Sequence, residues 1–122
     1  MPETRRMLAR DMVKLSKYVL PRFYGEVVLH EGREIGAVSV VWVERKPVLC
    51  LNLTDELRKF PVFLVKLGHR FIEEAVRDYG ELFTVEEPEE PTSNRFLKFL
   101  GFVDTGELID GRRLMKWQRS SH

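Results

Sequence analysis

The feature that most limits the fold is a helical stripe of apolar side chains that starts just after Pro61. Apolar or small residues recur there at spacings typical of one helix face: Leu64, Leu67, Gly68, Phe71, Ile72, Ala75, Val76 and Tyr79. Pro61 suits the first turn of a helix, and Gly80 suits its C-terminal exit. Strands are predicted on both sides, over 48–53 and 82–85. A strand, a helix and a strand in succession form a crossover, so these two strands should run parallel.

Three strands on short turns are predicted upstream of this helix, over residues 25–53. Residues 35–43 (IGAVSVVWV) form a β-branched run typical of a largely buried strand, and residues 48–53 (VLCLNL) form the next one. Turn chemistry separates the strands at 30–33 and at 45–47. Strands joined by such short turns form an antiparallel meander.

The N-terminal segment has apolar residues at a helical spacing, unlike the predicted strands that follow it. Apolar residues at spacings of four, three and four predict an amphipathic helix over 4–20, and they are Leu8, Met12, Leu15 and Val19. Pro21 ends this helix. The stripe favours a helix that packs on the core, although a basic amphipathic helix can also dock on a membrane or a partner.

The C-terminal third predicts a short helix and a hairpin. Residues 86–91 read as an acidic loop, after which Thr92 or Ser93 can cap a helix that runs to about Leu100. Gly101 stops that helix, because the residue after a helix often needs a positive φ. Two strands, 102–107 and 112–118, then pair around the turn at 109–111.

The 122 residues are therefore expected to form one domain, 1–122, with one core. Its parts would be an N-terminal helix within 1–24, the meander over 25–53, and a βαβ-α-ββ portion over 54–118. The expected class is α+β (mixed α/β), with a mostly antiparallel twisted sheet, a central βαβ crossover and a C-terminal β-hairpin.

Charge and cysteine content exclude several classes of function. The formal net charge is +1, so no global field favours a nucleic-acid binder or a membrane-surface protein. No apolar stretch is long enough to cross a bilayer, and no signal segment is evident. A single cysteine, Cys50, excludes an intrachain disulfide framework and reads as a buried apolar residue of a cytoplasmic protein. The histidines lack metal-ligand spacing, so no metal is expected.

The near-zero total charge hides a division along the chain. Residues 1–24 carry +4, residues 73–91 carry −7, and residues 92–122 carry +3. Such runs are typical of solvated helix faces and loops. The alternative is a difference of potential across a cleft, with the acidic segment on one side.

The order of elements, together with the segment FLKFLGF at 96–102, resembles the GCN5-related N-acetyltransferase (GNAT) superfamily. The resemblance covers residues 25–118 and implies a GNAT-like fold whose cofactor is acetyl-CoA. In that family the cofactor lies where the strand before the long helix splays from the next strand. Its pantetheine arm pairs with strand backbone, here Leu51 and Leu53, and its pyrophosphate sits in the loop 54–61.

The chain departs from the family's motifs at three places. The loop 54–61 (TDELRKFP) has no glycine, so Arg58 and Lys59 would have to bind phosphates by their side chains. Alignment on the Leu-Gly-Phe ending puts Leu97 at the position of the tyrosine that acts as general acid. It puts Glu90 at the position of a frequent asparagine, for which Asn94 is a partial substitute. Candidates for a catalytic base are Glu44 and Asn52, near the ends of central strands.

The function expected from these residues is that of a degenerate GNAT-fold protein, either non-catalytic or an atypical acetyltransferase-like protein. With its small size, shortened N-terminus and aromatic-rich helix before Leu-Gly-Phe, the chain also resembles the acetyltransferase-like virion-associated family of tailed bacteriophages, which would place it in a virion. One alternative is an active acetyl-CoA-dependent N-acetyltransferase that acts on an amine. The other is an unrelated small α+β ligand-binding module. A protein partner or a homodimer is expected for the non-catalytic reading.

Overall fold

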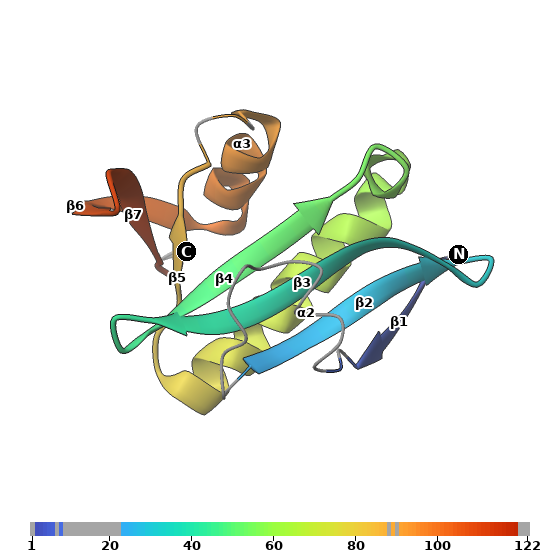
Figure 1. Ribbon diagram of the computed structural model, residues 1–122, viewed down its shortest axis with the longest axis horizontal. Coiled ribbons are helices and arrows are strands. Elements are labelled where there is room, and N and C mark those ends of the chain that lie inside the picture. The colour runs from blue at the N-terminus through green and yellow to red at the C-terminus, as the bar shows by residue number, and fades with distance from the viewer. Residues whose placement is uncertain (1, 7, 9–22, 88, 90, 120–122) are drawn as a thin grey trace.

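The computed structural model of the chain describes residues 2–6, 8, 23–87, 89 and 91–119 (Figure 1). Their strands form a single sheet of seven strands in the order β1-β2-β3-β4-β5-β7-β6. The elements in chain order are β1 (Glu3–Arg6), β2 (Phe23–His30), β3 (Arg33–Val43), β4 (Lys46–Leu53), η1 (Leu57–Lys59), α2 (Pro61–Tyr79), β5 (Phe83–Val85), α3 (Pro91–Leu100), β6 (Phe102–Ile109) and β7 (Arg112–Trp117).

All neighbouring strands are antiparallel except one pair. β4 and β5 run parallel, with Val48 opposite Phe83 and Leu49 opposite Thr84. Helix α2 joins these two strands, so the crossover predicted from the apolar stripe is confirmed. The predicted meander, the short helix α3 and the C-terminal hairpin are confirmed as well. The class is the predicted mixed α/β class with a mostly antiparallel sheet.

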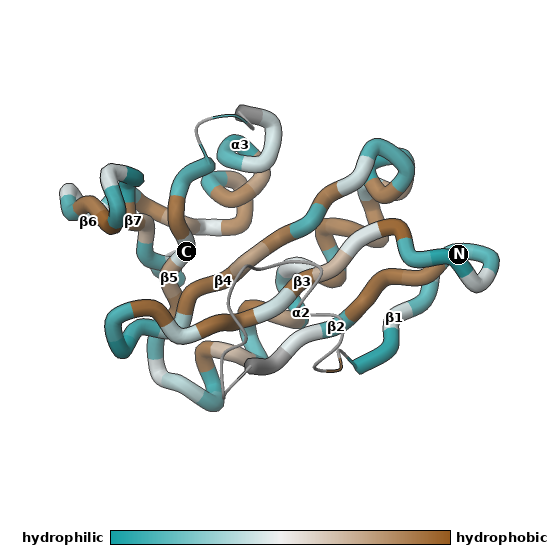
Figure 2. The backbone as a smooth tube through the Cα atoms, viewed as in Figure 1, coloured by the Kyte–Doolittle hydropathy of each residue, from teal (hydrophilic) through white to brown (hydrophobic). Residues whose placement is uncertain are grey.

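The main core lies between the sheet and α2, which lies behind the sheet in Figure 1. The predicted stripe is the buried face of α2, and Phe71, Ile72 and Ala75 are at most 1% exposed. Burial of a large apolar side chain contributes about 1.5–3 kcal/mol, so this helix anchors the fold. A second cluster covers the other face of the sheet, around Val41 and Leu114. Figure 2 shows apolar residues along β3 and β4 and hydrophilic residues at the hairpin turns.

The N-terminal prediction is wrong where it can be compared. Residues 4–6, expected at the start of a helix, belong to β1, which pairs with β2 from Glu3 opposite Leu29 to Arg6 opposite Glu26. The open edge of β2 supplies backbone partners for this segment, and that tertiary pairing outweighs a local helical period. Leu8 is 46% exposed. Residues 9–22, which carry the rest of the predicted helix, lie outside the described residues.

The second turn of the meander also differs from its prediction. It was expected at 45–47 but lies at Glu44–Arg45, where both residues have positive φ (49° and 66°). A two-residue hairpin turn needs positive φ at both central positions, and neither residue is one of the glycines or asparagines that normally signal it. Pro47 is consequently inside β4, opposite Trp42. The helix expected to start after a Thr92 or Ser93 cap begins instead at Pro91.

Helix α3 packs closely against α2. A Cβ atom placed on Gly68 of α2 would lie 3.0 Å from Leu100 Cδ1, so glycine lets the two helices approach here. Within the described part of the chain, no helix is long and apolar enough to span a bilayer.

Candidate functional site

The candidate site starts where β5 separates from β4. β5 has three residues and pairs with β4 only at Val48 and Leu49. The Thr84 hydroxyl donates a hydrogen bond of 2.9 Å to the Leu49 carbonyl oxygen at the last of these pairs. Past it, β5 stays with β7, as the 2.9 Å bond from Glu86 N to Arg113 O shows. The two parallel strands therefore splay apart beyond Leu49.

The backbone of β4 faces this gap at alternate residues. Because the Leu49 carbonyl points toward β5, the N–H and C=O groups of Leu51 and Leu53 point the same way, since strand backbone repeats every two residues. Pro47 lies an even number of residues from Leu49, so its backbone also faces away from β3, and its missing N–H removes no bond to that strand. The pairing of β3 with β4 is regular along its whole length. Leu51 and Leu53 thus present backbone groups to an edge that β5 does not cover.

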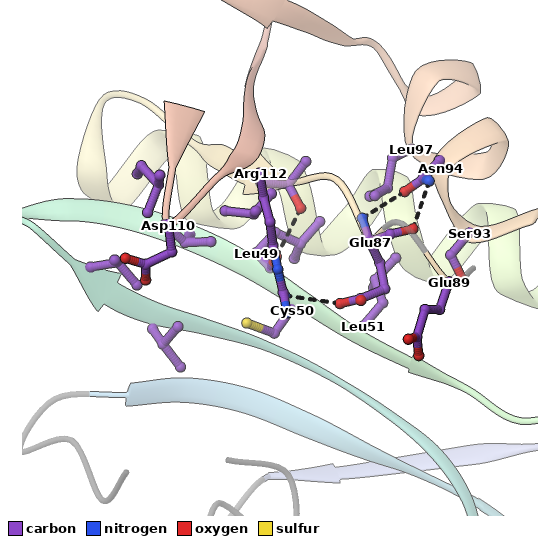
Figure 3. A pocket seen from close by; sticks show the side chains of 16 residues that line it. Leu49, Cys50, Leu51, Glu87, Glu89, Ser93, Asn94, Leu97, Asp110 and Arg112 are labelled. Atoms are coloured by element: carbon purple, nitrogen blue, oxygen red, sulfur yellow. Dashed lines mark hydrogen bonds and ion pairs between the residues drawn. The ribbon is translucent and has the colours of Figure 1, made fainter. Parts of the chain in front are cut away.

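A pocket of about 680 Å³ opens beside this edge (Figure 3). β3 and β4 form its floor, with Val41 and Cys50 among the residues that line it. The end of β5, the following loop and the start of α3 form one wall, and the tip of the β6–β7 hairpin forms another. Leu97 of α3 lines the pocket with an apolar surface.

The charged lining of the pocket is mainly acidic. Three carboxylates line it, those of Glu87, Glu89 and Asp110, together with one guanidinium, that of Arg112. Arg112 Nη1 lies 3.1 Å from Glu87 Oε2, so the hairpin and the loop after β5 are joined by an ion pair across the pocket (Figure 3). The acidic segment predicted from the sequence therefore does reach the cleft.

Asn94 holds the acidic loop in place. Its side-chain Nδ2 donates to the Glu87 carbonyl oxygen at 2.9 Å, and its Oδ1 accepts from the Glu87 N–H at 3.0 Å. Both the oxygen and the nitrogen of the Asn94 amide are therefore hydrogen-bonded to the backbone of Glu87. Asn94 lines the pocket, and in this arrangement it positions Glu87.

Cys50 is not the buried apolar residue that its leucine neighbours suggested. Its side chain is exposed and faces the pocket, on the side of the sheet opposite α2. The thiol lies in the concave pocket, and desolvation by the surrounding protein raises the pKa of Cys50 to about 11.

This pKa predicts slow alkylation of Cys50 in the folded protein. The thiolate is the reactive form, so the rate with iodoacetamide should rise about tenfold per pH unit from pH 7 to pH 10. At neutral pH the folded protein should react about 100-fold more slowly than the same chain unfolded in denaturant, because the pKa is raised from 9.0 to about 11. Cys50 is the only cysteine, so total adduct measured by mass spectrometry reports this site alone. A rate that levels off below pH 9 would contradict the raised pKa.

The loop that precedes α2 is held by Thr54. The Thr54 hydroxyl donates to the Ile35 carbonyl oxygen of β3 and accepts from the Leu57 N–H at 3.2 Å. The N–H groups of Arg58, Lys59 and Phe60 donate to carbonyls within the same loop. Since Pro61 has no N–H, few amides remain for an anion at this end of α2. The positively charged donors of the loop are the side chains of Arg58 and Lys59.

Arg58 of this loop contacts a residue that lines the pocket. Its Nη2 lies 3.4 Å from Ser93 Oγ, which lines the pocket, and its Nη1 lies 3.5 Å from Asp55 Oδ1. Lys59 is exposed on the same short helix η1. A cationic side chain thus stands between the α2 loop and the first turn of α3.

The predicted site residues are brought together only in part. Leu51 and Asn94 line the pocket, and Arg58 contacts its edge. Glu44 lies in the exposed β3–β4 turn, and Asn52 is exposed on β4, and neither lines the pocket. Glu90 lies outside the described residues.

Sequence reasoning missed Asp110, Arg112 and Thr84 as pocket residues. The Asp-Gly pair at 110–111 signalled the hairpin, but the direction in which its tip points depends on the register of β7 with β5. Among the described residues, no three His, Cys, Asp or Glu side chains gather as a metal ion would require.

No model of a known protein family matches the sequence, and no curated protein matches it closely enough to be a relative. Solved structures with the same fold do match over nearly the whole chain. An IAA acetyltransferase from Bacillus cereus has a TM-score of 0.64 at 14% identity, over 95% of this chain and 97% of its own. A chimera of the spermidine N-acetyltransferase SpeG from Vibrio cholerae and hSSAT has a TM-score of 0.63 at 15% identity, over 95% and 94%.

A third structure is described as a GNAT-family acetyltransferase. This protein, a putative member from Bordetella pertussis, has a TM-score of 0.60 at 15% identity over 79% of this chain and 65% of its own. These TM-scores establish a shared fold, and identities this low leave activity open. The chain therefore has the fold of the GCN5-related N-acetyltransferases.

Proposed function

We propose that this chain is an atypical acetyltransferase-like protein that binds an acyl thioester such as acetyl-CoA along β4 and a cationic amine in the adjoining pocket. The observation that carries the proposal is the splay of β5 from β4 after Leu49, which leaves the backbone of Leu51 and Leu53 facing a gap. An amide-bearing chain can add to such an edge as an extra strand, because its own N–H and C=O groups complete the open ladder. The pantetheine arm of CoA carries amides of this kind.

The phosphate end of the cofactor would be bound in an unusual way. Four amides of the loop before α2 are already bonded within the loop, and Arg58 and Lys59 are its positively charged groups that could neutralise phosphates. Exposed ion pairs are weakened by salt. Binding through these side chains should therefore be weaker and more sensitive to salt than binding by a glycine-rich loop.

The acidic pocket suits a positively charged acceptor. Glu87, Glu89 and Asp110 place carboxylates around a volume that is otherwise lined largely by apolar side chains. They would attract an ammonium group, and a carboxylate can accept a proton from it before the amine reacts. The name of one structural neighbour, a spermidine N-acetyltransferase, supports an amine as the class to test.

Acetyl-CoA, when bound, would supply the activated acyl group, and the chain would contribute mainly by orienting the two ligands. Leu97 cannot donate a proton to a departing thiolate. The Cys50 thiol is a protonated group of the lining at neutral pH, because its pKa is about 11. The proposal assigns no role to Glu44 or Asn52, since both lie outside the pocket lining.

A non-catalytic binding protein is the second candidate function. It is favoured by the hydrocarbon side chain of Leu97 where the family places a hydroxyl, and by the glycine-free loop. In this case the same cleft would hold a ligand without turning it over, and a protein partner or a second copy of the chain would be its target.

Calorimetry with acetyl-CoA tests the cofactor part of the proposal. We expect saturable binding that Arg58→Glu weakens at least about tenfold, since a cation near the phosphates is replaced by an anion. Lys98→Glu, the same charge change at an exposed position of α3, should have little effect. Absence of binding at millimolar acetyl-CoA would contradict the proposal.

Mass spectrometry of amine mixtures then separates the two candidate functions. An increase of one acetyl group on spermidine or another amine, dependent on both acetyl-CoA and the protein, would establish transfer. Binding of acetyl-CoA with no acetylated product would favour the non-catalytic candidate.

A further inference from the structure

Arg112 is the one basic residue among the described residues that line the pocket, and it lies amid the carboxylates (Figure 3). It follows directly on the Asp110–Gly111 turn and reaches across to Glu87, 3.1 Å away. Glu89 and Asp110 make no ion pair with the described residues. The close view shows them on opposite sides of the Arg112–Glu87 pair. The pocket therefore has a neutralised centre and a free carboxylate on either side.

The charge of the lining follows from this arrangement. Three carboxylates and one guanidinium leave a formal charge of −2. The Arg112 and Glu87 side chains are 49% and 42% exposed, and an ion pair this exposed contributes little to stability. Its effect on the charge that a ligand meets is larger, because a cation in the pocket is attracted by each carboxylate and repelled by Arg112.

We infer that Arg112 determines which amines the pocket binds. By neutralising Glu87 it limits the pocket to two separated carboxylates, Glu89 and Asp110, which match an extended molecule with an ammonium group at each end. The inference rests on the proposed function, in which this pocket is the amine site. In the absence of Arg112 the pocket would carry −3, and its preference would move toward more highly charged amines.

The test measures binding of three amines to the full chain by calorimetry at fixed salt. The ligands are n-butylamine, 1,4-diaminobutane and spermidine, which carry about one, two and three positive charges at neutral pH. We expect the wild type to bind the diamine well above the monoamine and to gain little from the third charge. Arg112→Ala should tighten spermidine binding about tenfold, tighten the diamine less, and change the monoamine least.

Two matched variants distinguish charge from shape. Arg112→Lys keeps the cation and should restore the wild-type order of affinities. Arg113→Ala removes the next arginine along β7, which pairs with Asp104 at 3.5 Å and does not line the pocket, and it should leave all three affinities unchanged. In Arg112→Ala, further change of Glu87→Gln should reverse the gain for spermidine.

The outcomes separate this inference from the function on which it rests. If the wild type binds the diamine and Arg112→Ala shows no gain that grows with ligand charge, Arg112 has only a structural role and the inference fails alone. If no variant binds any amine while acetyl-CoA still binds, the amine part of the proposed function fails, and the inference fails with it.

Discussion

Replacement of Gly36 by alanine is expected to destabilise the protein by about 3 kcal/mol and to lower its melting temperature by on the order of 10 °C. A Cβ atom at this position would lie 2.4 Å from Leu57 Cδ2 and 2.7 Å from the Asn52 carbonyl oxygen. The leucine end could move, but the carbonyl belongs to the neighbouring strand β4. Its displacement would disturb the ladder between β3 and β4, where Ala37 lies opposite Asn52.

The same change should also disturb the candidate cofactor site. Leu57 is 1% exposed and holds η1 against the sheet, and the next two residues of η1 are Arg58 and Lys59. A shift of Leu57 would therefore move the cations assigned to the phosphates. Thermal unfolding followed by circular dichroism measures the loss of stability, and acetyl-CoA calorimetry below the transition measures the effect on the site.

Gly68→Ala is the matched control for Gly36→Ala. Its Cβ would lie 3.0 Å and 3.2 Å from the two methyl groups of Leu100, which are flexible side-chain ends. Alanine is better than glycine in a helix by roughly 1 kcal/mol, and this gain offsets the crowding. We expect its stability to stay within about 1 kcal/mol of the wild type. Equal losses in the two variants would show that the strand carbonyl is not the cause.

The elements that the sequence predicted well are those whose period continues over many residues. Helix α2 has eight stripe positions between Pro61 and Gly80, and it begins and ends where these two residues indicated. The three hairpins show the limit of turn chemistry. The turns at Glu31–Gly32 and Asp110–Gly111 contain glycine and lie within their predicted ranges, whereas Glu44–Arg45 contains none and was misplaced.

The N-terminal strand could not be predicted from its own residues. Glu3–Arg6 is polar and charged, and burial varies little along it, so no alternation of apolar and polar side chains marks it as a strand. Its conformation depends on the free edge of β2, with which it pairs residue by residue. An edge strand of this kind is visible only once its partner is in place.

The candidate site depends on where strands stop, and sequence patterns report strand ends poorly. Cys50 continues an apolar run that predicts burial, yet its side chain is exposed and lines the pocket beside the splayed strands. The runs of like charge can be seen in the sequence, but the ion pairs that their side chains form cannot. The acidic segment is partly neutralised by residues far along the chain, such as Arg112 with Glu87 and Lys116 with Glu81. The sum of charges over residues 73–91 therefore overstates the negative potential that an anionic cofactor would meet.

Replacement of Leu51 by proline is expected to weaken acetyl-CoA binding about 100-fold while the protein stays folded. The change removes the N–H that faces the gap between β4 and β5, and the ring occupies the edge to which the cofactor arm would pair. Loss of one backbone donor and of access to the edge corresponds to about 2–3 kcal/mol of binding free energy. Calorimetry with acetyl-CoA measures the loss.

The same strand already contains the precedent for this substitution. Pro47 lies an even number of residues from Leu51 and is accommodated within β4, because its nitrogen faces away from β3. Proline at Cys50 should behave differently. The Cys50 N–H points the other way, toward Ser39 of β3. Cys50→Pro should therefore remove a hydrogen bond between β3 and β4 and destabilise the fold by about 3 kcal/mol or more.

Leu51→Ala completes the comparison, because it removes the side chain that packs against the main core and keeps the backbone N–H. Leu51→Ala and Leu51→Pro should both lose stability through the missing side chain, and only the proline variant should lose acetyl-CoA. If the two variants are folded and bind acetyl-CoA equally, the cofactor does not pair with β4. The splay between β4 and β5 would then be a feature of the fold without the ligand that its open edge fits.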